Sequence, residues 1–230
     1  MKCLVPSRIQ HRQAGFTLVE LSMSLIFIAF IMLFLTSTML SIMGTYNKGV
    51  WMNQINQASR QINSDISDQA QFSSNLITIS TTNQRLCIGN VAYLWNTAAD
   101  VATGGTIHNW FSDEVDGTGA FKGTTNLRFV RVTGSDASQY CSPGSTKLPD
   151  RNDSNTTILL GSGVVVQRFD VTQNATTRLL RIHTVFSTGG DVQPHPETDA
   201  SGVVRWQCDV HNQFCAFTEL NLIVYGRIGI

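Results

Sequence analysis

The sequence contains few charged residues, and one long part of it contains none. Charged residues make up 14% of the 230 residues, and the formal net charge is zero. No Asp, Glu, Lys or Arg occurs from Leu21 to Asn47. A chain with this balance has no broad positive field for nucleic acid, so a nucleic-acid partner is not expected, although a local basic patch stays possible.

The sequence also lacks the motifs that hydrolytic enzymes need. A nucleophile elbow has the pattern G-x-S-x-G between a strand and a helix, whereas Gly161-Ser162-Gly163 is followed only by a β pattern. Paired carboxylates of the kind that glycosidases use cannot be placed from the sequence. His183, His195 and His211 lie in separate segments and are expected to be structural or exposed, with His195, between two prolines, the most exposed. The chain is therefore expected not to be an enzyme and to need no cofactor.

The uncharged stretch is long enough to cross a membrane. A helix needs roughly 20 apolar residues to span the hydrocarbon core of a bilayer. Lys2, Arg8 and Arg12 give the first 15 residues a charge of +3 with no acid. Basic residues on this flank favour keeping it in the cytoplasm. We expect a single-pass protein of the cytoplasmic membrane with an extracytoplasmic C-terminal part.

An ordinary secretory signal does not fit this N-terminal region. The apolar run exceeds the usual core of roughly 7–15 residues, and no small-residue A-x-A cleavage site follows it. Glu20 also stands at the start of the apolar run. A carboxylate near lipid is costly unless it has a partner, so Glu20 is a functional candidate.

The segment Gly15-Phe16-Thr17-Leu18-Val19-Glu20 resembles the class III leader of type IV pilins and type II secretion pseudopilins. The resemblance implies that a membrane peptidase cuts between Gly15 and Phe16 and methylates the new amine of Phe16. It also implies that Glu20 pairs with that amine, on its own or a neighbouring chain, and so places a subunit in a filament. The alternatives are an ordinary membrane anchor and an unpartnered Glu20 at the headgroup level. Ser37 stands where the family commonly has a proline, and Gly44 is the candidate for a helix break instead.

The family fold is α+β, with a long N-terminal helix lying on an antiparallel β-sheet domain that has large loops. On this pattern, residues 1–15 are a cleaved leader, 16–46 the transmembrane and filament-core helix, 47–72 its amphipathic second half, and 73–230 a β-rich head. The spacing of apolar residues after residue 50 predicts one stripe on a helix, which the family packs against the sheet; it comprises Trp51, Ile55, Ala58, Ile62, Ile66 and Ala70. A free amphipathic helix or a coiled coil is the alternative, although few charges could steer coiled-coil pairing.

After residue 72 the apolar period approaches two, which predicts strands. The strands are expected at 76–80, 86–95 with a bulge at Gly89-Asn90, 127–132, 158–171 with a break at Gly161-Ser162-Gly163, 178–186, 203–208 and 214–227. Residues 96–126 and 133–157 are expected to be long loops. The region of Gly189-Gly190 and Pro194-His195-Pro196 is expected to be an exposed turn.

Four of the five cysteines follow the apolar run. If that part of the chain is extracytoplasmic, two disulfides are expected. Cys208 and Cys215 are close enough in sequence to close a hairpin, which would leave Cys87 to pair with Cys141. Four cysteines permit three pairings, and a zinc site is a rival interpretation. No C-x-x-C occurs, however, and His211 is the only histidine near the last pair.

The segment Ser112-Asp113-Glu114-Val115-Asp116-Gly117 has carboxylates of the kind that bind calcium. Its spacing does not fit an EF-hand, because Gly123 stands where the twelfth-position glutamate belongs. A solvated acidic turn is the favoured interpretation, and no metal site is predicted.

The resemblance implies a structural function. A helix followed by a hairpin that ends in Val91-Ala92-Tyr93-Leu94-Trp95 is similar to larger minor pilins and J-type pseudopilins. The expected function is that of a minor pilin, which primes or joins a type IV filament for adhesion, twitching motility or DNA uptake. Its expected partners are the prepilin peptidase, other pilins, the inner-membrane assembly platform and the membrane before assembly. The alternatives are a J-type pseudopilin and a filament-tip binding module that uses the loops and Trp110 or Phe111.

Overall fold

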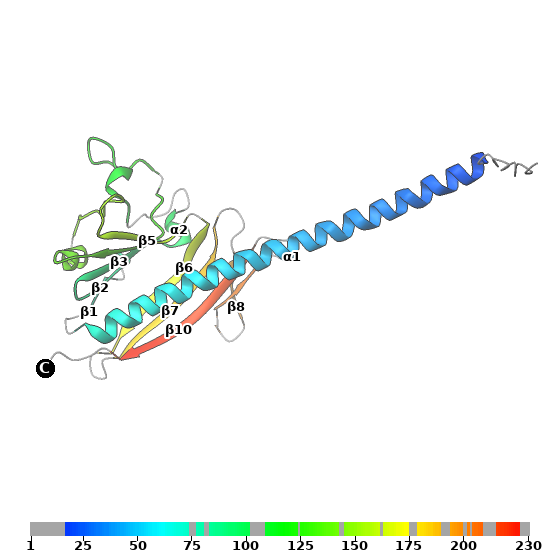
Figure 1. Cartoon of the computed structure of the whole chain (residues 1–230). Helices are drawn as coiled ribbons and strands as arrows, with labels where there is room; N and C mark the ends of the chain where they lie inside the picture. Colours follow the sequence, from blue (N-terminus) through cyan, green and yellow to red (C-terminus); the bar gives the residue numbers. More distant parts are fainter. Residues whose placement is uncertain are drawn as a thin grey trace, which may run out of the picture. The chain divides into compact units, whose positions relative to one another are not determined.

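The computed structural model describes residues 17–73, 77–80, 83–101, 109–123, 125–142, 145–161, 163–174, 179–189, 194–199, 202, 204–208 and 215–225. The chain divides into two compact units, residues 1–44 and 45–230. The described part of the first unit is the N-terminal part of one long helix. The second unit holds the rest of that helix and the strands of the described residues, and we call it the head (Figure 1).

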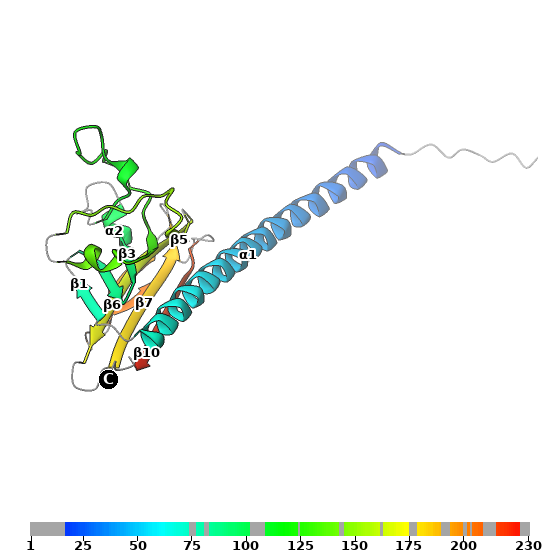
Figure 2. The ribbon, with the colours of Figure 1, turned by 60° about the vertical axis from the view of Figure 1, so that its left-hand side comes forward.

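Helix α1 spans Leu18–Phe72. Within the head its apolar stripe is buried as predicted: Ile55, Ile62 and Ile66 have no exposed surface. Trp51 and Ala58 pack against the same core. The head's turns of α1 lie alongside strands β7 and β10 in both views of the ribbon (Figures 1 and 2). The structure therefore has a helix packed on antiparallel sheets, which confirms the α+β class.

A five-stranded antiparallel sheet has the order β1-β2-β3-β4-β5. Its strands are β1 (Ile77–Ser80), β2 (Arg85–Ile88), β3 (Val91–Trp95), β4 (Phe129–Thr133) and β5 (Thr156–Leu160). Every residue of β2 and β3 is buried, because both faces of these strands are covered. One face belongs to the core shared with α1, and the other carries a separate apolar cluster.

The described residues of the head also form two smaller sheets. The first has the order β10-β7-β6, with β6 (Val164–Gln173), β7 (Leu179–Thr188) and β10 (Phe217–Tyr225). The second pairs β8 (His195–Thr198) with β9 (Val204–Gln207). On β10 the predicted alternation holds, since Leu220 and Leu222 are half-buried and Val224 is buried. Apolar residues of β6, β7 and β10 join α1 and the larger sheet in one core.

Two sequence predictions about turns are wrong. Gly89-Asn90 is not a bulge within one strand but the turn between β2 and β3, where Ile88 pairs with Val91. Gly89 has a φ of 58°, which glycine adopts without strain, so a tight turn forms here. His195 and Pro196 lie in strand β8 rather than in a turn. Proline is tolerated there because β8 lies at the edge of its sheet.

The predicted loop regions are partly ordered, and they cover the second face of the larger sheet. They contain the short helices α2 (Ala98–Val101), η1 (Ser112–Glu114) and η2 (Ala137–Cys141). Phe111 and Tyr140 of these regions pack with residues of β2, β3 and β4 in the second apolar cluster. Because these segments bury strand side chains, they belong to the folded core of the head.

Asp65 of α1 joins the helix to the larger sheet. Its carboxylate accepts a hydrogen bond of 2.7 Å from the Tyr93 hydroxyl and one of 3.0 Å from Arg131 Nη1. The Tyr93 residue has no exposed surface. Burial, and the hydrogen bond to Asp65, raise the pKa of the Tyr93 hydroxyl above its ordinary range.

We expect Asp65→Ala to lower the free energy of unfolding by about 2–3 kcal/mol, because it leaves the buried Tyr93 hydroxyl without a partner. Guanidinium unfolding of the full chain in detergent measures this. Asp68→Ala, at an exposed site on the same helix, is the control and should change it by less than about 0.5 kcal/mol. Adding Tyr93→Phe to Asp65→Ala should recover part of the loss, and equal effects of the two aspartate variants would contradict this role.

Gly163 precedes β6 and lies against Trp51 of α1. A Cβ atom at Gly163 would stand 2.8 Å from Trp51 Cζ3, whereas one at Gly161 would meet nothing within 4 Å. We expect Gly163→Ala to destabilise the head by about 1–3 kcal/mol through overpacking. Gly161→Ala is the matched control and should have little effect. The same guanidinium unfolding measurement tests this expectation. Equal midpoints for Gly163→Ala and Gly161→Ala would show that the close approach to Trp51 has no cost.

Candidate functional site on the N-terminal helix

The first unit exposes a continuous apolar surface. Large side chains from Leu18 to Met43 are mostly solvent-exposed, with 84% of Leu18 and 70% of Phe34 accessible. Soluble monomers rarely expose a contiguous apolar patch above a few hundred Å². The helix is long and apolar enough to cross a membrane, with a mean hydropathy of 2.5 in its most apolar window. This surface needs either lipid or other apolar helices around it.

Four hydroxyl groups on this apolar helix donate hydrogen bonds within the helix itself. Ser24 and Thr36 donate to the backbone carbonyls of the residues four positions earlier, at 2.9 and 2.7 Å. Ser22 and Thr38 also donate to carbonyls of the preceding turn. These bonds let the hydroxyls enter an apolar environment without an unpaired donor.

The helix break suggested for Gly44 is absent. Helix α1 continues through Ser37, Gly44 and Gly49 to Phe72. An interior glycine weakens a helix by about 1 kcal/mol relative to alanine but keeps its backbone N–H and C=O groups. The backbone hydrogen bonds of α1 can therefore continue through these positions.

Glu20 lies in the first turn of α1 and forms a capping box with Thr17. Its Oε2 accepts hydrogen bonds from the Thr17 backbone N–H at 3.2 Å and from the Thr17 hydroxyl at 3.1 Å. The Glu20 N–H donates in return to Thr17 Oγ1 at 3.3 Å. These bonds satisfy free donors at the helix start, and the carboxylate also suits the positive end of the helix dipole. No hydrogen bond joins Glu20 Oε1 to a described residue, so this oxygen remains available for a cation.

The predicted cleavage site, Gly15 and Phe16, lies outside the described residues. The adjacent Thr17 is described and begins the helix as its N-cap. Sequence reasoning assigned Glu20 only an assembly role and missed its capping role. The signal was present in the sequence, because Thr17-Leu18-Val19-Glu20 has the T-x-x-E spacing of a capping box ahead of an apolar run.

The four cysteines after α1 form the two disulfides expected from the sequence. Cys87 of β2 is bonded to Cys141 at the end of η2, and Cys208 is bonded to Cys215. The first bond ties the second apolar cluster to the larger sheet. A sulfur in a disulfide is not available as a thiolate ligand for zinc. Cys3 and His211 lie outside the described residues.

The carboxylates Glu114 and Asp116 of the calcium candidate are engaged with other groups of the head. Buried Glu114 accepts hydrogen bonds from the Phe111 N–H, the Thr125 hydroxyl and the Asn126 N–H, and it forms an ion pair of 3.1 Å with Arg151. Asp116 accepts from the Thr118 and Ala120 N–H groups, and its bond with the Thr118 hydroxyl lowers its pKa most. In the described part of the chain, no group of three or more His, Cys, Asp or Glu residues could hold a metal.

The described histidines are paired on strands. His183 Nε2 of β7 lies 2.7 Å from Glu219 Oε1 of β10, and its Nδ1 lies 3.9 Å from Asp170 of β6. His195 of β8 lies 3.7 Å from Glu197 on the same strand. These contacts place both histidines in sheets rather than beside a candidate nucleophile. Ser162 lies outside the described residues.

Comparison of the chain with family models, curated proteins and solved structures found no match.

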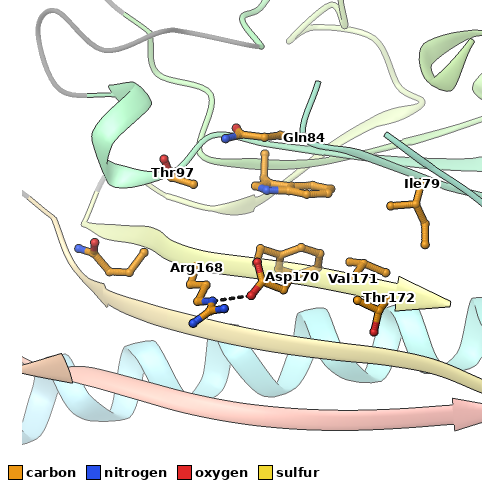
Figure 3. Close-up of a pocket in the computed structure, with 10 residues that line it drawn as sticks. Ile79, Gln84, Thr97, Arg168, Asp170, Val171 and Thr172 are labelled. Carbon is orange, nitrogen blue, oxygen red and sulfur yellow. Dashed lines mark hydrogen bonds and ion pairs between the residues drawn. The ribbon is translucent and has the colours of Figure 1, made fainter. Parts of the chain in front are cut away.

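A cavity of about 460 Å³ lies between β6 and the ends of β1 and β3 (Figure 3). Trp95 and Phe169 line it with a ring separation of 4.6 Å, but they are only 3% and 6% exposed. The Arg168 guanidinium is paired with the Asp170 carboxylate of the same strand. The two aromatic rings are thus packed in the core, and the two charged groups pair with each other. This cavity therefore offers few free groups to a ligand.

Proposed function

We propose that the chain is a minor pilin, a structural subunit that primes or joins a type IV filament. One observation carries this proposal: the segment Gly15–Glu20 leads into α1, and the apolar side chains of this part of the helix are exposed. In this proposal the peptidase cuts after Gly15 and methylates Phe16. The helix then holds the subunit in the cytoplasmic membrane until the assembly platform transfers it to a bundle of similar helices.

The chemistry of the first turn supports this proposal. Glu20 Oε2 is held by Thr17, which fixes the carboxylate at the helix start. Oε1 is left to receive the ammonium group that cleavage would create at Phe16. In an apolar bundle an unpaired carboxylate is costly, so this pair would favour the register in which amine and acid meet.

The head supports an extracytoplasmic location. Two disulfides form and persist in an oxidising compartment, and both lie in the head. The basic leader flank favours keeping the other end of the helix in the cytoplasm. We propose that the head is displayed on the outer face of the membrane and then on the filament, and we propose no catalytic activity for it.

Deleting the gene and examining the cell surface tests this function. A minor pilin that primes assembly predicts loss of filaments, with recovery when the intact chain is restored but not when Gly15→Val blocks cleavage. Normal filaments together with a defect in protein secretion would instead favour a J-type pseudopilin. Normal filaments that no longer attach would favour a tip module. The test for a tip module needs point variants rather than loop deletions, because Phe111, Ala137 and Tyr140 of these loops belong to the core of the head.

A further inference from the structure

A second cavity, of about 330 Å³, lies beside β2 in the head. Its wall includes Asn83, Arg85, Ser145, Thr146 and Leu148. These residues come from the turn before β2, from β2 itself and from the segment after η2. A water molecule occupies roughly 30 Å³ in the liquid, so the cavity has room for a small ion together with several waters.

Arg85 lines this cavity as a buried cation without a carboxylate partner. The residue is 4% exposed, and no described carboxylate lies within ion-pair distance of its guanidinium. Residues 81–82, 102–108 and 143–144 lie outside the described residues, and none of them is an Asp or Glu. Burial holds the pKa of Arg85 below its ordinary range. Because a buried charge is costly without a counter-charge, this site favours an anion.

Two other arginines of the head show the contrast. Arg131 lies 3.0 Å from the Asp65 carboxylate, and Arg151 lies 3.1 Å from the Glu114 carboxylate. Both cations are therefore neutralised by the chain itself. Arg85 is more deeply buried than either, yet its counter-charge has to come from the solution.

The hydrogen bonds of the Arg85 guanidinium indicate which kind of anion fits. Nε donates to Asn109 Oδ1 at 2.8 Å, and Nη1 donates to the carbonyls of Tyr140 and Ser145 at 2.7 and 3.4 Å. Nη2 makes no hydrogen bond to a described residue, and it is not among the fully buried unpaired atoms of the head. A bidentate carboxylate or phosphate needs two nitrogens of the guanidinium, and only one is free. A single nitrogen suits a spherical, monovalent anion.

Asn109 holds the guanidinium in place. It is 1% exposed, and its Nδ2 donates to the carbonyls of Trp95 and Asn83 at 2.8 and 2.9 Å. Its Oδ1 is thereby fixed as the acceptor for Arg85 Nε. A donor that is held this firmly loses little freedom when an anion binds.

We propose that Arg85 binds a chloride ion in this cavity. The ion receives a hydrogen bond from Nη2 and supplies the counter-charge that the buried guanidinium lacks, and water fills the remaining volume. This inference concerns the head alone and does not rest on the proposed function.

Chlorine nuclear magnetic resonance of the full chain in a non-ionic detergent tests the proposal, because a chloride ion that exchanges with a protein site gains line width. The decisive variant is Thr146→Glu, which places a carboxylate on the wall of the same cavity as an internal counter-charge. Thr146→Gln is the matched control without the charge. Thr146 is exposed and Arg85 keeps its hydrogen bonds, so neither change should disturb the core.

We expect the native chain and Thr146→Gln to broaden the chloride signal beyond detergent alone, and Thr146→Glu to lose this broadening. Absence of broadening by the native chain, or equal broadening by the two variants, would overturn the proposal.

Unfolding by urea gives a second readout of the same site. Replacing sodium gluconate by sodium chloride at constant ionic strength should raise the folding equilibrium constant of the native chain and of Thr146→Gln roughly fivefold, because the ion binds the folded state only. Thr146→Glu should show no rise. An equal rise in all three chains would be a general effect of the salt and would contradict a site at Arg85.

Discussion

Replacing Glu20 by glutamine is expected to remove the chain from surface filaments while leaving it in the membrane. Glutamine at this position can still accept the hydrogen bonds of the capping box, but it has no charge. It therefore cannot form an ion pair with the ammonium proposed at Phe16. Fractionation of cells into sheared filaments and membranes, followed by immunoblotting of each, measures the expected loss.

Thr17→Ala is the matched control for this experiment. It removes the capping hydroxyl, at a cost of about 1 kcal/mol to the helix start, but leaves the Glu20 carboxylate in place. We expect this variant to enter filaments nearly as the native chain does. The opposite pattern, in which Glu20→Gln is incorporated and Thr17→Ala is not, would mean that the helix cap matters and the charge does not.

Removing the Cys87–Cys141 disulfide is expected to have the largest effect on the stability of the head. The two cysteines are 54 positions apart, and loop-closure entropy predicts a loss of about 4 kcal/mol for a loop of this length. Both residues are also buried in the second apolar cluster. Cys87→Ala with Cys141→Ala should therefore shift the guanidinium unfolding midpoint strongly in non-reducing buffer.

The Cys208–Cys215 bond provides the comparison for that result. It spans only seven positions, so its removal should cost less, about 2 kcal/mol on the same entropic account. Measuring both double variants under the same conditions shows which disulfide contributes more to the free energy of unfolding. A smaller effect for Cys87 and Cys141 than for Cys208 and Cys215 would show that loop length does not govern the stability of this head.

The long helix and most strands could be predicted because their patterns are local. The spacing from Trp51 to Ala70 gives a helical face that does not depend on the rest of the fold. The β2–β3 turn was harder, because Gly89-Asn90 fits either a bulge or a turn. The role of the segments around Phe111 and Tyr140 could not be predicted, since their polar, glycine-rich sequence does not indicate which sheet face they cover.

The candidate sites also differ in whether the sequence alone could predict their contacts. Thr17 and Glu20 are three residues apart, so their hydrogen bonds follow from sequence spacing alone. Arg85 and Asn109 meet only through the fold, and nothing local indicates that the arginine is buried without an acid. The acidic residues of the calcium candidate could be identified in the sequence. The ion pair of Glu114 with Arg151 could not, because it depends on contacts between distant segments.

The intact mass of the protein purified from its own cells tests the central claim most directly, since that claim is a helix freed by cleavage for assembly. The account predicts a chain that begins at Phe16 and carries one added methyl group on its terminal amine. A chain that keeps residues 1–15, in cells with an active prepilin peptidase, would contradict it.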